Sequence, residues 1–421
     1  MPEPDLGVEK EPESSAKEER SEDEQFERLS SELINMLYHH PIKIIPNESE
    51  DETKETKGPS IEQRIQWDLV PKDIVKYLDR MVIKQDEAKK SLAIAICDHL
   101  NHIRADRDGN SEFYQKQNVL MVGPSGVGKT YMIKKIADFI GLPFIKSDAT
   151  KLSETGYQGA DVDDLVRQLF AASDNNLEWA QYGIIYIDEI DKITGGTRPD
   201  GRDVGGKGVQ QTMLKLMEET EVPSQVNWDM QNQIKQMMGK QLEENQAINT
   251  KHILFIVSGA FTGLEEICKS RLSGSKYGFE RGEKGLPEDI VSQSNTEDFR
   301  KFGLEQEFIG RLPIRVFCHE LSVDDLFELL KHGEESILKQ YVQSFEHYGI
   351  SMEFTDGALR AIAKKAAEEK TGARGLGSVL ESIFRDYKYE CPDSGLKHIK
   401  VDKALVNAPK ATLEALLASH A

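Results

Sequence analysis

Short apolar runs alternate with helical spacings through the middle of the chain. The apolar runs, which predict buried strands, are 117–123, 143–150, 183–188 and 252–259. Segments in which apolar residues recur every three or four positions predict helices over 85–104, 129–140, 161–171 and 207–219. Strands that alternate with helices in this way favour a parallel sheet with helices on both faces. The pattern therefore predicts an α/β fold.

The pattern changes after Pro313. Helical spacings dominate from there, with one late strand expected near 398–401. We therefore expect a large α/β domain over 61–315 and a smaller, mainly α-helical domain over 316–421. Inside the large domain, the glycine-rich stretch 192–208 is expected to be irregular, and 229–244 has helical spacing.

The first 60 residues differ in composition from the rest. They hold 17 Asp and Glu against 7 Lys and Arg, so their net charge of 7 − 17 = −10 is half of the −20 of the whole chain. Residues 1–24 have too few large apolar side chains to offset the entropy of ordering. Apolar positions over 25–38 indicate a short amphipathic helix, which either packs on its own core or binds a partner. We expect 1–60 to be a largely disordered acidic leader.

Overall charge and cysteine content limit the function classes. A net charge of −20 argues against nucleic acid as the main partner. The four cysteines form no C-x-x-C pair, so neither a disulfide framework nor a cysteine-rich zinc site is expected. The N-terminus lacks a signal-peptide pattern, and no apolar run is long enough to span a membrane. A cytoplasmic protein without a membrane partner is the expectation.

A phosphate-binding loop follows the first apolar run. The matching residues of the pattern G-x-x-x-x-G-K-[ST] are Gly123, Pro124, Ser125, Gly126, Val127, Gly128, Lys129 and Thr130. A strand before the loop and a helix after it are the context that the pattern requires. Backbone N–H groups and the helix N-terminus would hold the phosphates of ATP. Lys129 would reach the β- and γ-phosphates, and Thr130 would ligate Mg²⁺.

Two adjacent acids end the third apolar run. Asp188 and Glu189 follow the apolar run at 183–187, about 60 residues after the phosphate loop. Asp188 would hold the metal through water, and Glu189 would act as the general base on the attacking water. The loop and the acidic pair together predict hydrolysis of a nucleoside triphosphate, but they do not indicate what work it drives.

Several further segments resemble the ClpX family of AAA+ ATPases, over roughly residues 62–405. The segment around Tyr157 (G-Y-Q-G) is similar to the family's G-Y-V-G pore loop. Those around Arg311 (E-F-I-G-R-L-P) and Arg374 (K-T-G-A-R-G-L) resemble its arginine-finger and sensor-2 segments. Val82 and Ile83 match the family's V-I-G-Q adenine-pocket turn, in which Lys84 replaces the glycine.

The resemblance implies an AAA+ P-loop large domain, a small helical domain and a homohexameric ring with a central pore. It implies that Tyr157 grips unfolded or tagged protein substrates and that ATP hydrolysis pulls them through. Val204, in the glycine-rich stretch 202–208, would be the apolar contact of a second pore loop. Arg311 would reach the neighbouring subunit's γ-phosphate, and Arg374 would sense the nucleotide from the small domain. Ser258 stands where AAA+ proteins carry a polar sensor-1 residue.

The chain departs from the family in three places. The N-terminal zinc-binding module is absent, and the basic R-K-H loop near the pore entrance is missing. The I/L-G-F loop that docks the peptidase appears as Tyr277, Gly278 and Phe279. Phe279 could still enter an apolar pocket of a ClpP-like peptidase, which we expect to be the partner.

Four other readings remain open. The chain could be a stand-alone remodelling chaperone, which uses the same motor without a peptidase. An HslU-like unfoldase ranks second among related families, because the long inserted domain expected after the second acidic motif is missing. A nucleic-acid AAA+ motor should line its channel with Lys and Arg, whereas this pore loop offers Tyr157. A nucleotide-gated scaffold without turnover would not need Glu189 and Arg311. No protease triad is recognisable, so proteolysis would belong to the partner.

Overall fold

The computed structural model describes residues 60–110, 116–153, 160–194, 206–224, 246–274, 289–333 and 336–419. The predicted leader with its helix over 25–38 and the helical spacing over 229–244 lie outside these ranges. So do Tyr157, Val204 and the docking segment 277–279.

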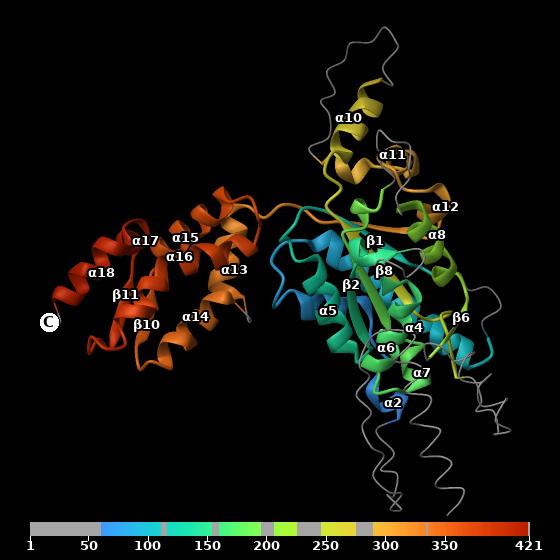
Figure 1. Ribbon diagram of the computed structural model, residues 1–421, viewed down its shortest axis with the longest axis horizontal. Helices are drawn as coiled ribbons and strands as arrows, with labels where there is room; N and C mark the ends of the chain where they lie inside the picture. The colour runs from blue at the N-terminus through green and yellow to red at the C-terminus, as the bar shows by residue number, and fades with distance from the viewer. Residues whose placement is uncertain are drawn as a thin grey trace, which may run out of the picture. The chain divides into compact units, whose positions relative to one another are not determined.

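A five-stranded sheet forms the centre of the larger region (Figure 1). Its strand order is β2-β5-β8-β1-β9, and every neighbouring pair is parallel. The bounds are β1 (Val119–Val122), β2 (Phe144–Asp148), β5 (Ile184–Asp188), β8 (Leu254–Gly259) and β9 (Ile314–Phe317). All four apolar runs are strands, as predicted. The fifth strand, β9, was not expected, because its IRVF sequence alternates with charge and follows Pro313.

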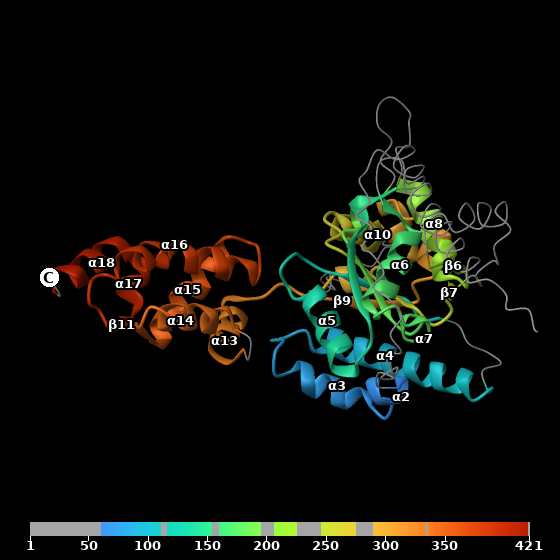
Figure 2. The ribbon, with the colours of Figure 1, turned by 60° about the horizontal axis from the view of Figure 1, so that its bottom comes forward.

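Helices cover both faces of this sheet. Successive strand residues point to opposite faces. Ile184 and Tyr186 accordingly pack with α3 (Pro71–Leu78), α4 (Asp86–Arg107) and α5 (Lys129–Ile140). Ile185 and Ile187 pack instead with α6 (Asp163–Ala172) and α8 (Gly206–Met217). Figure 2 shows α3, α4 and α5 together on one side, with α6 and α8 on the other. The predicted parallel sheet with helices on both faces is confirmed.

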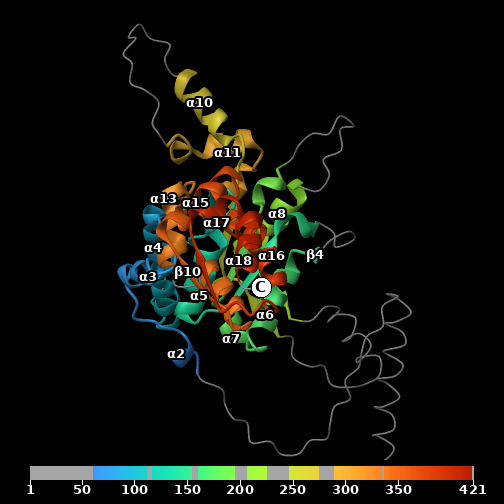
Figure 3. The same cartoon turned by 90° about the vertical axis from the view of Figure 1, so that its left-hand side faces the viewer.

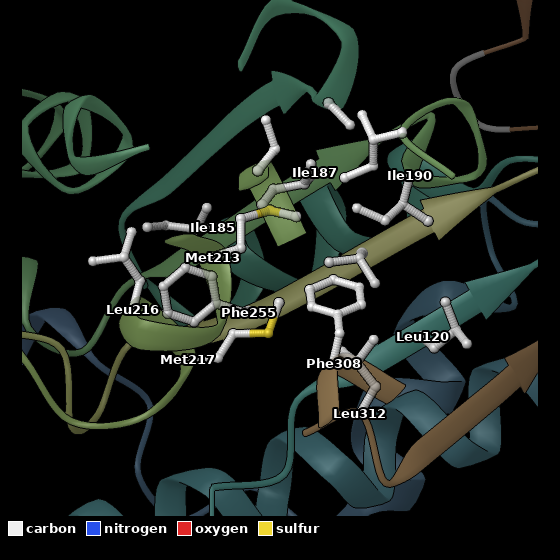
Figure 4. Close-up of a cluster of buried hydrophobic side chains, with 14 of the residues drawn as sticks. Leu120, Ile185, Ile187, Ile190, Met213, Leu216, Met217, Phe255, Phe308 and Leu312 are labelled. Carbon is white, nitrogen blue, oxygen red and sulfur yellow. The ribbon is translucent and has the colours of Figure 1, made fainter. Parts of the chain in front are cut away.

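The core on the α6 and α8 face is drawn in Figure 4. Phe255 of β8 lies among Met213, Leu216 and Met217 of α8, and all four side chains are almost fully buried. Phe308 of α12 (Gln306–Gly310) and Leu312 close the same core beside the strands. This packing connects the chain on both sides of Arg311 to the sheet.

Shorter elements complete the larger region. These are α2 (Ile61–Arg64), η1 (Ala149–Lys151), β3 (Leu152–Ser153), β4 (Ala160–Asp161), α7 (Leu177–Ala180), η2 (Ile190–Lys192), β6 (Glu221–Pro223), β7 (Ala247–Asn249), α10 (Leu264–Gly274), η3 (Val291–Gln293) and α11 (Thr296–Phe302). The stretch 192–208 was expected to be irregular, but α8 already begins at Gly206. Val209 and Met213 are buried on this helix, so packing stabilises its first turn despite the two glycines there.

The C-terminal region has a hydrophobic core of its own. Figures 1 and 3 show its helices grouped with β10. The elements are α13 (Val323–His332), α14 (Ile337–Glu346), β10 (Ser351–Phe354), α15 (Asp356–Glu368), α16 (Arg374–Glu390), β11 (His398–Val401), α17 (Lys403–Asn407) and α18 (Pro409–Ala418). The expected strand near 398–401 is β11, which pairs in parallel with β10.

The helices and the cysteines bear on two further sequence predictions. None of the helices in the described ranges is long and apolar enough to cross a membrane. All four cysteines lie in these ranges, and each is a buried free thiol.

Candidate functional site

A cavity of about 550 Å³ lies at the carboxyl ends of the sheet strands. The phosphate loop, the turn 81–83 and the acids after β5 line it together with residues of the C-terminal region. Crevices at the carboxyl ends of parallel strands are the usual ligand sites of such sheets. The volume suits a ligand of the size of a nucleotide.

The phosphate loop leads from β1 directly into α5. The helix begins at Lys129, and Gly128, Lys129 and Thr130 at its N-terminus line the cavity. Lys129 is buried, and its Nζ donates to the carbonyl oxygens of Gly123 (2.5 Å) and Pro124 (2.8 Å). Burial lowers the pKa of Lys129. A buried ammonium held by neutral carbonyls is well placed to take an anionic partner.

The two acids stand beside the loop. Thr130 Oγ1 lies 3.3 Å from Asp188 Oδ2, so the two predicted metal ligands are together. Glu189 follows in a left-handed conformation with φ 58°, and it lines the cavity as an exposed side chain. Such a conformation is uncommon for a residue other than glycine and is often found at functional positions.

A hydroxyl network fixes the orientation of Asp188. Ser258 donates to Asp188 Oδ1 at 2.6 Å and lies 2.6 Å from the hydroxyl of Tyr186. Thr130 in turn donates to the Tyr186 hydroxyl at 3.1 Å. Ser258, for which the family resemblance implies the sensor-1 position, is thereby in contact with Asp188. The network holds Asp188 in place.

Tyr186 was missed by the sequence reasoning. A signal was present, because Tyr186 and Asp188 are two positions apart on a strand and so share one face. The tyrosine is fully buried, and burial raises its pKa. It therefore stays protonated and acts as a hydrogen-bonding link between Thr130 and Ser258.

Lys146 of β2 also belongs to the site, although no motif includes it. Its Nζ lies 3.0 Å from Asp188 Oδ2. Burial by itself would raise the pKa of Asp188, but the hydrogen bonds from Ser258 and Lys146 and the charge of Lys146 outweigh burial and lower it. Asp188 is consequently a carboxylate at neutral pH.

The other end of the cavity is apolar. Val82 and Ile83 line it together with Leu321, Leu329 and Leu376 of the C-terminal region. A flat aromatic base is the kind of group that fits such a lining. The sequence-predicted adenine-pocket residues thus share one cavity with the phosphate loop.

The turn after Ile83 is held in an unusual conformation. Lys84 and Gln85 both have positive φ, 61° and 65°. The Gln85 side chain donates to the carbonyl of His319 (2.7 Å) and accepts from its N–H (2.9 Å). Lys84 Nζ donates to Asp325 Oδ2 at 3.0 Å. These contacts connect the turn to the segment that leads into α13.

Arg374 reaches the phosphate loop from the C-terminal region. It begins α16, and its Nη1 donates to Ser125 Oγ at 2.9 Å. The preceding residue, Ala373, donates its N–H to the carbonyl of Gly126 at 2.9 Å. The predicted sensor-2 arginine therefore lines the same cavity as the loop.

Arg311 is placed differently. It is half-exposed and does not line the cavity; its Nη2 forms an ion pair with Glu218 Oε1 at 2.6 Å. The backbone of Arg311 is held by buried Asn118, whose Nδ2 donates to its carbonyl at 3.1 Å. Of the predicted site residues in the described ranges, Arg311 alone lies away from the others.

The residues present fit a magnesium ion. The hydroxyl of Thr130 and the carboxylate of Asp188 are hard oxygen ligands of the kind that Mg²⁺ takes in phosphate sites. The ammonium of Lys146 lies within 3.0 Å of Asp188 and 3.4 Å of Thr130, so this pair already holds a cation.

Two protein-family models match parts of the chain. The family model of the AAA domain (Cdc48 subfamily) matches residues 114–315, which contain the phosphate loop and both acids. The model of the C-terminal, D2-small domain of ClpB protein matches residues 322–387, which contain Arg374.

Individual relatives extend the similarity over most of the chain. The chain is 40% identical over 337 residues to "ATP-dependent Clp protease ATP-binding subunit ClpX" of Borrelia duttonii (strain Ly), covering 78% of this chain and 76% of that protein. It is 38% identical to the ClpX of Azotobacter vinelandii over 76% of this chain and 74% of that protein. It is 37% identical to the ClpX of Treponema denticola over 80% of this chain and 81% of that protein. The chain belongs to the ClpX family of AAA+ ATPases.

Proposed function

We propose that this chain is an ATP-dependent protein unfoldase and translocase. One observation carries the proposal: the phosphate loop, the acidic pair and Arg374 line one cavity whose other end suits a base. Such a site supports ATP hydrolysis, and membership of the ClpX family supports unfolding as the work that the hydrolysis drives. The protein itself has ATPase activity and no protease activity.

Each residue of the phosphate end has a role that follows from its position. Lys129 exchanges the carbonyls of Gly123 and Pro124 for the β- and γ-phosphates of ATP. Glu189 accepts a proton from the water that attacks the γ-phosphate. Thr130 and Asp188 would hold Mg²⁺, which when bound neutralises charge on the phosphates. Ser258 and Tyr186 keep Asp188 oriented during the reaction.

The two arginines would act on the same phosphates from different sides. Arg374 can turn from Ser125 to the nucleotide, because both groups line the cavity. Arg311 is exposed and lies away from its own cavity, which supports a role at the site of a neighbouring subunit. We accordingly propose a homohexameric ring in which Arg311 completes the next ATP site.

We further propose that Tyr157 and Val204 contact the substrate in the pore of this ring. An aromatic ring can grip any polypeptide through apolar contact, without reading its sequence. Unfolded or tagged proteins are the proposed substrates.

A ClpP-like peptidase is the proposed partner, docked through Tyr277, Gly278 and Phe279. The proposal is supported by the relatives, whose names describe them as ATP-binding subunits of ATP-dependent Clp protease. Proteolysis would then be carried out by the peptidase on the unfolded chain that it receives.

We infer a division into a large domain from about residue 61 and a small domain that follows β9. The separate hydrophobic core of the C-terminal helices supports this division. Val316 and Cys318 are buried with the core of the sheet, which supports a boundary just after Cys318.

The central test is unfolding of a stably folded, tagged fluorescent protein, followed as loss of fluorescence with ATP and without a peptidase. Wild type is expected to unfold it. Glu189→Gln should bind ATP but lose hydrolysis and unfolding, whereas Tyr157→Ala should keep ATPase and lose unfolding. ATPase without unfolding of reporters tagged at either end would overturn the proposal.

Peptidase docking is tested separately with a ClpP-like peptidase and a fluorogenic protein substrate. Phe279→Ala should unfold the reporter at the wild-type rate but release no peptides. If peptide release is unchanged in Phe279→Ala, this segment does not dock the peptidase.

A further inference from the structure

Lys146 stands at the metal side of the proposed ATP site, outside every motif that predicted the site. It is the third residue of β2, directly across from Tyr186 on the neighbouring strand β5. Its Nζ lies 5.9 Å from the centre of the Tyr186 ring, 3.0 Å from Asp188 Oδ2 and 3.4 Å from Thr130 Oγ1. The ammonium thus contacts both proposed ligands of Mg²⁺.

The two oxygens of Asp188 have different partners. Oδ1 accepts hydrogen bonds from Ser258 (2.6 Å) and from the N–H of Glu189 (3.1 Å). Oδ2 faces Thr130 and Lys146. The hydroxyl network therefore occupies one oxygen and directs the other toward a cation.

Lys146 and Asp188 also differ in exposure. The Lys146 side chain is 42% exposed, whereas that of Asp188 is 19% exposed. The lysine is the more exposed member of the pair, so we expect that it can move away without disturbing the core. A flexible four-carbon stem with a point charge suits a cation that is displaced and returns.

We propose that Lys146 is a built-in cation that occupies the magnesium position of the nucleotide-free site and competes there with Mg²⁺. The proposal rests on the proposed ATP site and concerns how that site takes up its metal. Two like charges at Asp188 Oδ2 repel each other, so Mg²⁺ binds more favourably when the ammonium moves away. Lys146 thereby raises the Mg²⁺ concentration that the loaded site requires.

The same charge has the opposite effect when metal is absent. The triphosphate of ATP is strongly anionic, and an ammonium beside Thr130 offsets part of this charge. Lys146 should therefore weaken metal binding and strengthen metal-free nucleotide binding. A purely structural role of Lys146 would not weaken metal binding and strengthen metal-free nucleotide binding at the same time.

Metal binding is measured with Mn²⁺, whose free ion gives an electron paramagnetic resonance signal that disappears on binding. Full-length protein is saturated with a non-hydrolysable ATP analogue and titrated with Mn²⁺. In Lys146→Met we expect Mn²⁺ to bind about threefold to fivefold more tightly. This factor corresponds to the free energy that an ion pair as exposed as Lys146 and Asp188 contributes. Lys146→Arg, which retains the charge, should stay near wild type.

Metal-free binding is measured with a fluorescent ATP analogue in excess EDTA. Lys146→Met should bind it more weakly than wild type by a similar factor. Lys134→Met is the matched control, since Lys134 is exposed on α5 one turn after Thr130 and its removal changes the net charge equally. This control should leave both measurements unchanged.

The outcomes separate the two proposals. If wild type binds no ATP analogue under either condition, the proposed ATP site itself fails. If wild type binds but Lys146→Met leaves Mn²⁺ affinity unchanged or weaker, the competition proposal alone is overturned. A loss of ATP turnover with unchanged Mn²⁺ affinity would also overturn it, because Lys146 would then act on the phosphates instead.

Discussion

Backbone conformations at single residues shape the nucleotide cavity. Lys84 adopts a left-handed conformation at a position where the resembled family has glycine. The cost of that conformation is about 1–2 kcal/mol for a residue with a Cβ atom. The contacts of Lys84 with Asp325 and with the carbonyl of Glu320 offset part of this cost. With lysine in place of glycine, position 84 is less free in its backbone but is connected to α13 through Asp325.

Gly126 of the phosphate loop also has a positive φ, and its replacement is expected to destabilise the protein. Its φ is 76°, and a Cβ atom there would lie 2.0 Å from the carbonyl oxygen of Thr371. Gly126→Ala should destabilise the protein by the left-handed cost of about 1–2 kcal/mol and by roughly 1–3 kcal/mol more for the clash. It should also separate Arg374 from Ser125 and weaken nucleotide binding.

Gly109→Ala is the control for Gly126→Ala. Gly109 has a similar φ of 73°, but a Cβ atom there would meet nothing within 4 Å. The free energy of unfolding of both variants is measured with a denaturant. Gly109→Ala gives the cost of the left-handed conformation alone, and Gly126→Ala gives that cost plus the cost of the clash. Equal destabilisation would mean that the loop and the segment 371–374 are not packed as described.

At the scale of elements, the edge strand β9 determines where Arg311 lies. Asn118, just before β1, is 1% exposed and connects two strands: its Oδ1 accepts from the Phe255 N–H of β8, and its Nδ2 donates to the Arg311 carbonyl. The arginine is therefore attached to the centre of the sheet through one buried amide.

Replacing Asn118 tests this connection. Asn118→Leu removes an acceptor from a buried N–H and should destabilise the protein by about 1–3 kcal/mol. Because Arg311 loses its anchor, ATP turnover should fall more than ATP binding does. Comparing turnover with binding of a fluorescent ATP analogue checks this expectation, and a parallel fall of both would contradict it.

A partly buried lysine between elements predicts a pH effect. Lys116 donates to the carbonyls of Glu218 (3.1 Å) and Thr250 (2.6 Å), and burial lowers its pKa from 10.5 to about 7. Between these values the unfolded chain binds the proton that the folded protein lacks, so stability rises with pH. The contribution of Lys116 to the free energy of unfolding should increase by about 1 kcal/mol per pH unit in this window. This contribution is absent in Lys116→Met.

Denaturant midpoints of wild type and Lys116→Met over this pH range provide the measurement. The difference in unfolding free energy should move in favour of wild type as the pH increases. A difference that stays constant with pH would show that Lys116 does not titrate there.

At the scale of the whole molecule, the proposed ring makes one site depend on two subunits. Glu189→Gln lacks the base but keeps Arg311, and Arg311→Ala keeps the base but lacks the arginine. Each variant alone should be almost without ATPase. Mixed rings should recover part of the activity, because an Arg311→Ala site then receives the arginine of a Glu189→Gln neighbour.

ATPase of the mixture, measured after the subunits have exchanged, is compared with each variant alone. A mixture of Glu189→Gln with Lys129→Ala is the control, since both lesions affect the hydrolytic centre and neither subunit can supply an intact one. Activity in the first mixture that does not exceed its components would argue against a shared site.

Local sequence was sufficient for four of the five strands of the central sheet, for the phosphate loop and for the acidic pair. Periodicity depends on neighbouring residues, and the loop is a continuous segment between a strand and a helix, so these features appear directly in the sequence. The family also followed from short segments. The roles of Tyr157, Val204 and 277–279 stay predictions, because these residues lie outside the described ranges.

Tertiary structure decided which distant residues share the cavity. Thr130 and Asp188 are 58 positions apart, and Arg374 and Ser125 are 249 apart. Lys146 joined the site only because β2 and β5 are neighbours in the sheet. Strand order and packing bring such residues together, and neither is encoded in any local pattern. The sequence therefore determined the chemistry of the loop and the acids, whereas the fold determined which cation lies beside them.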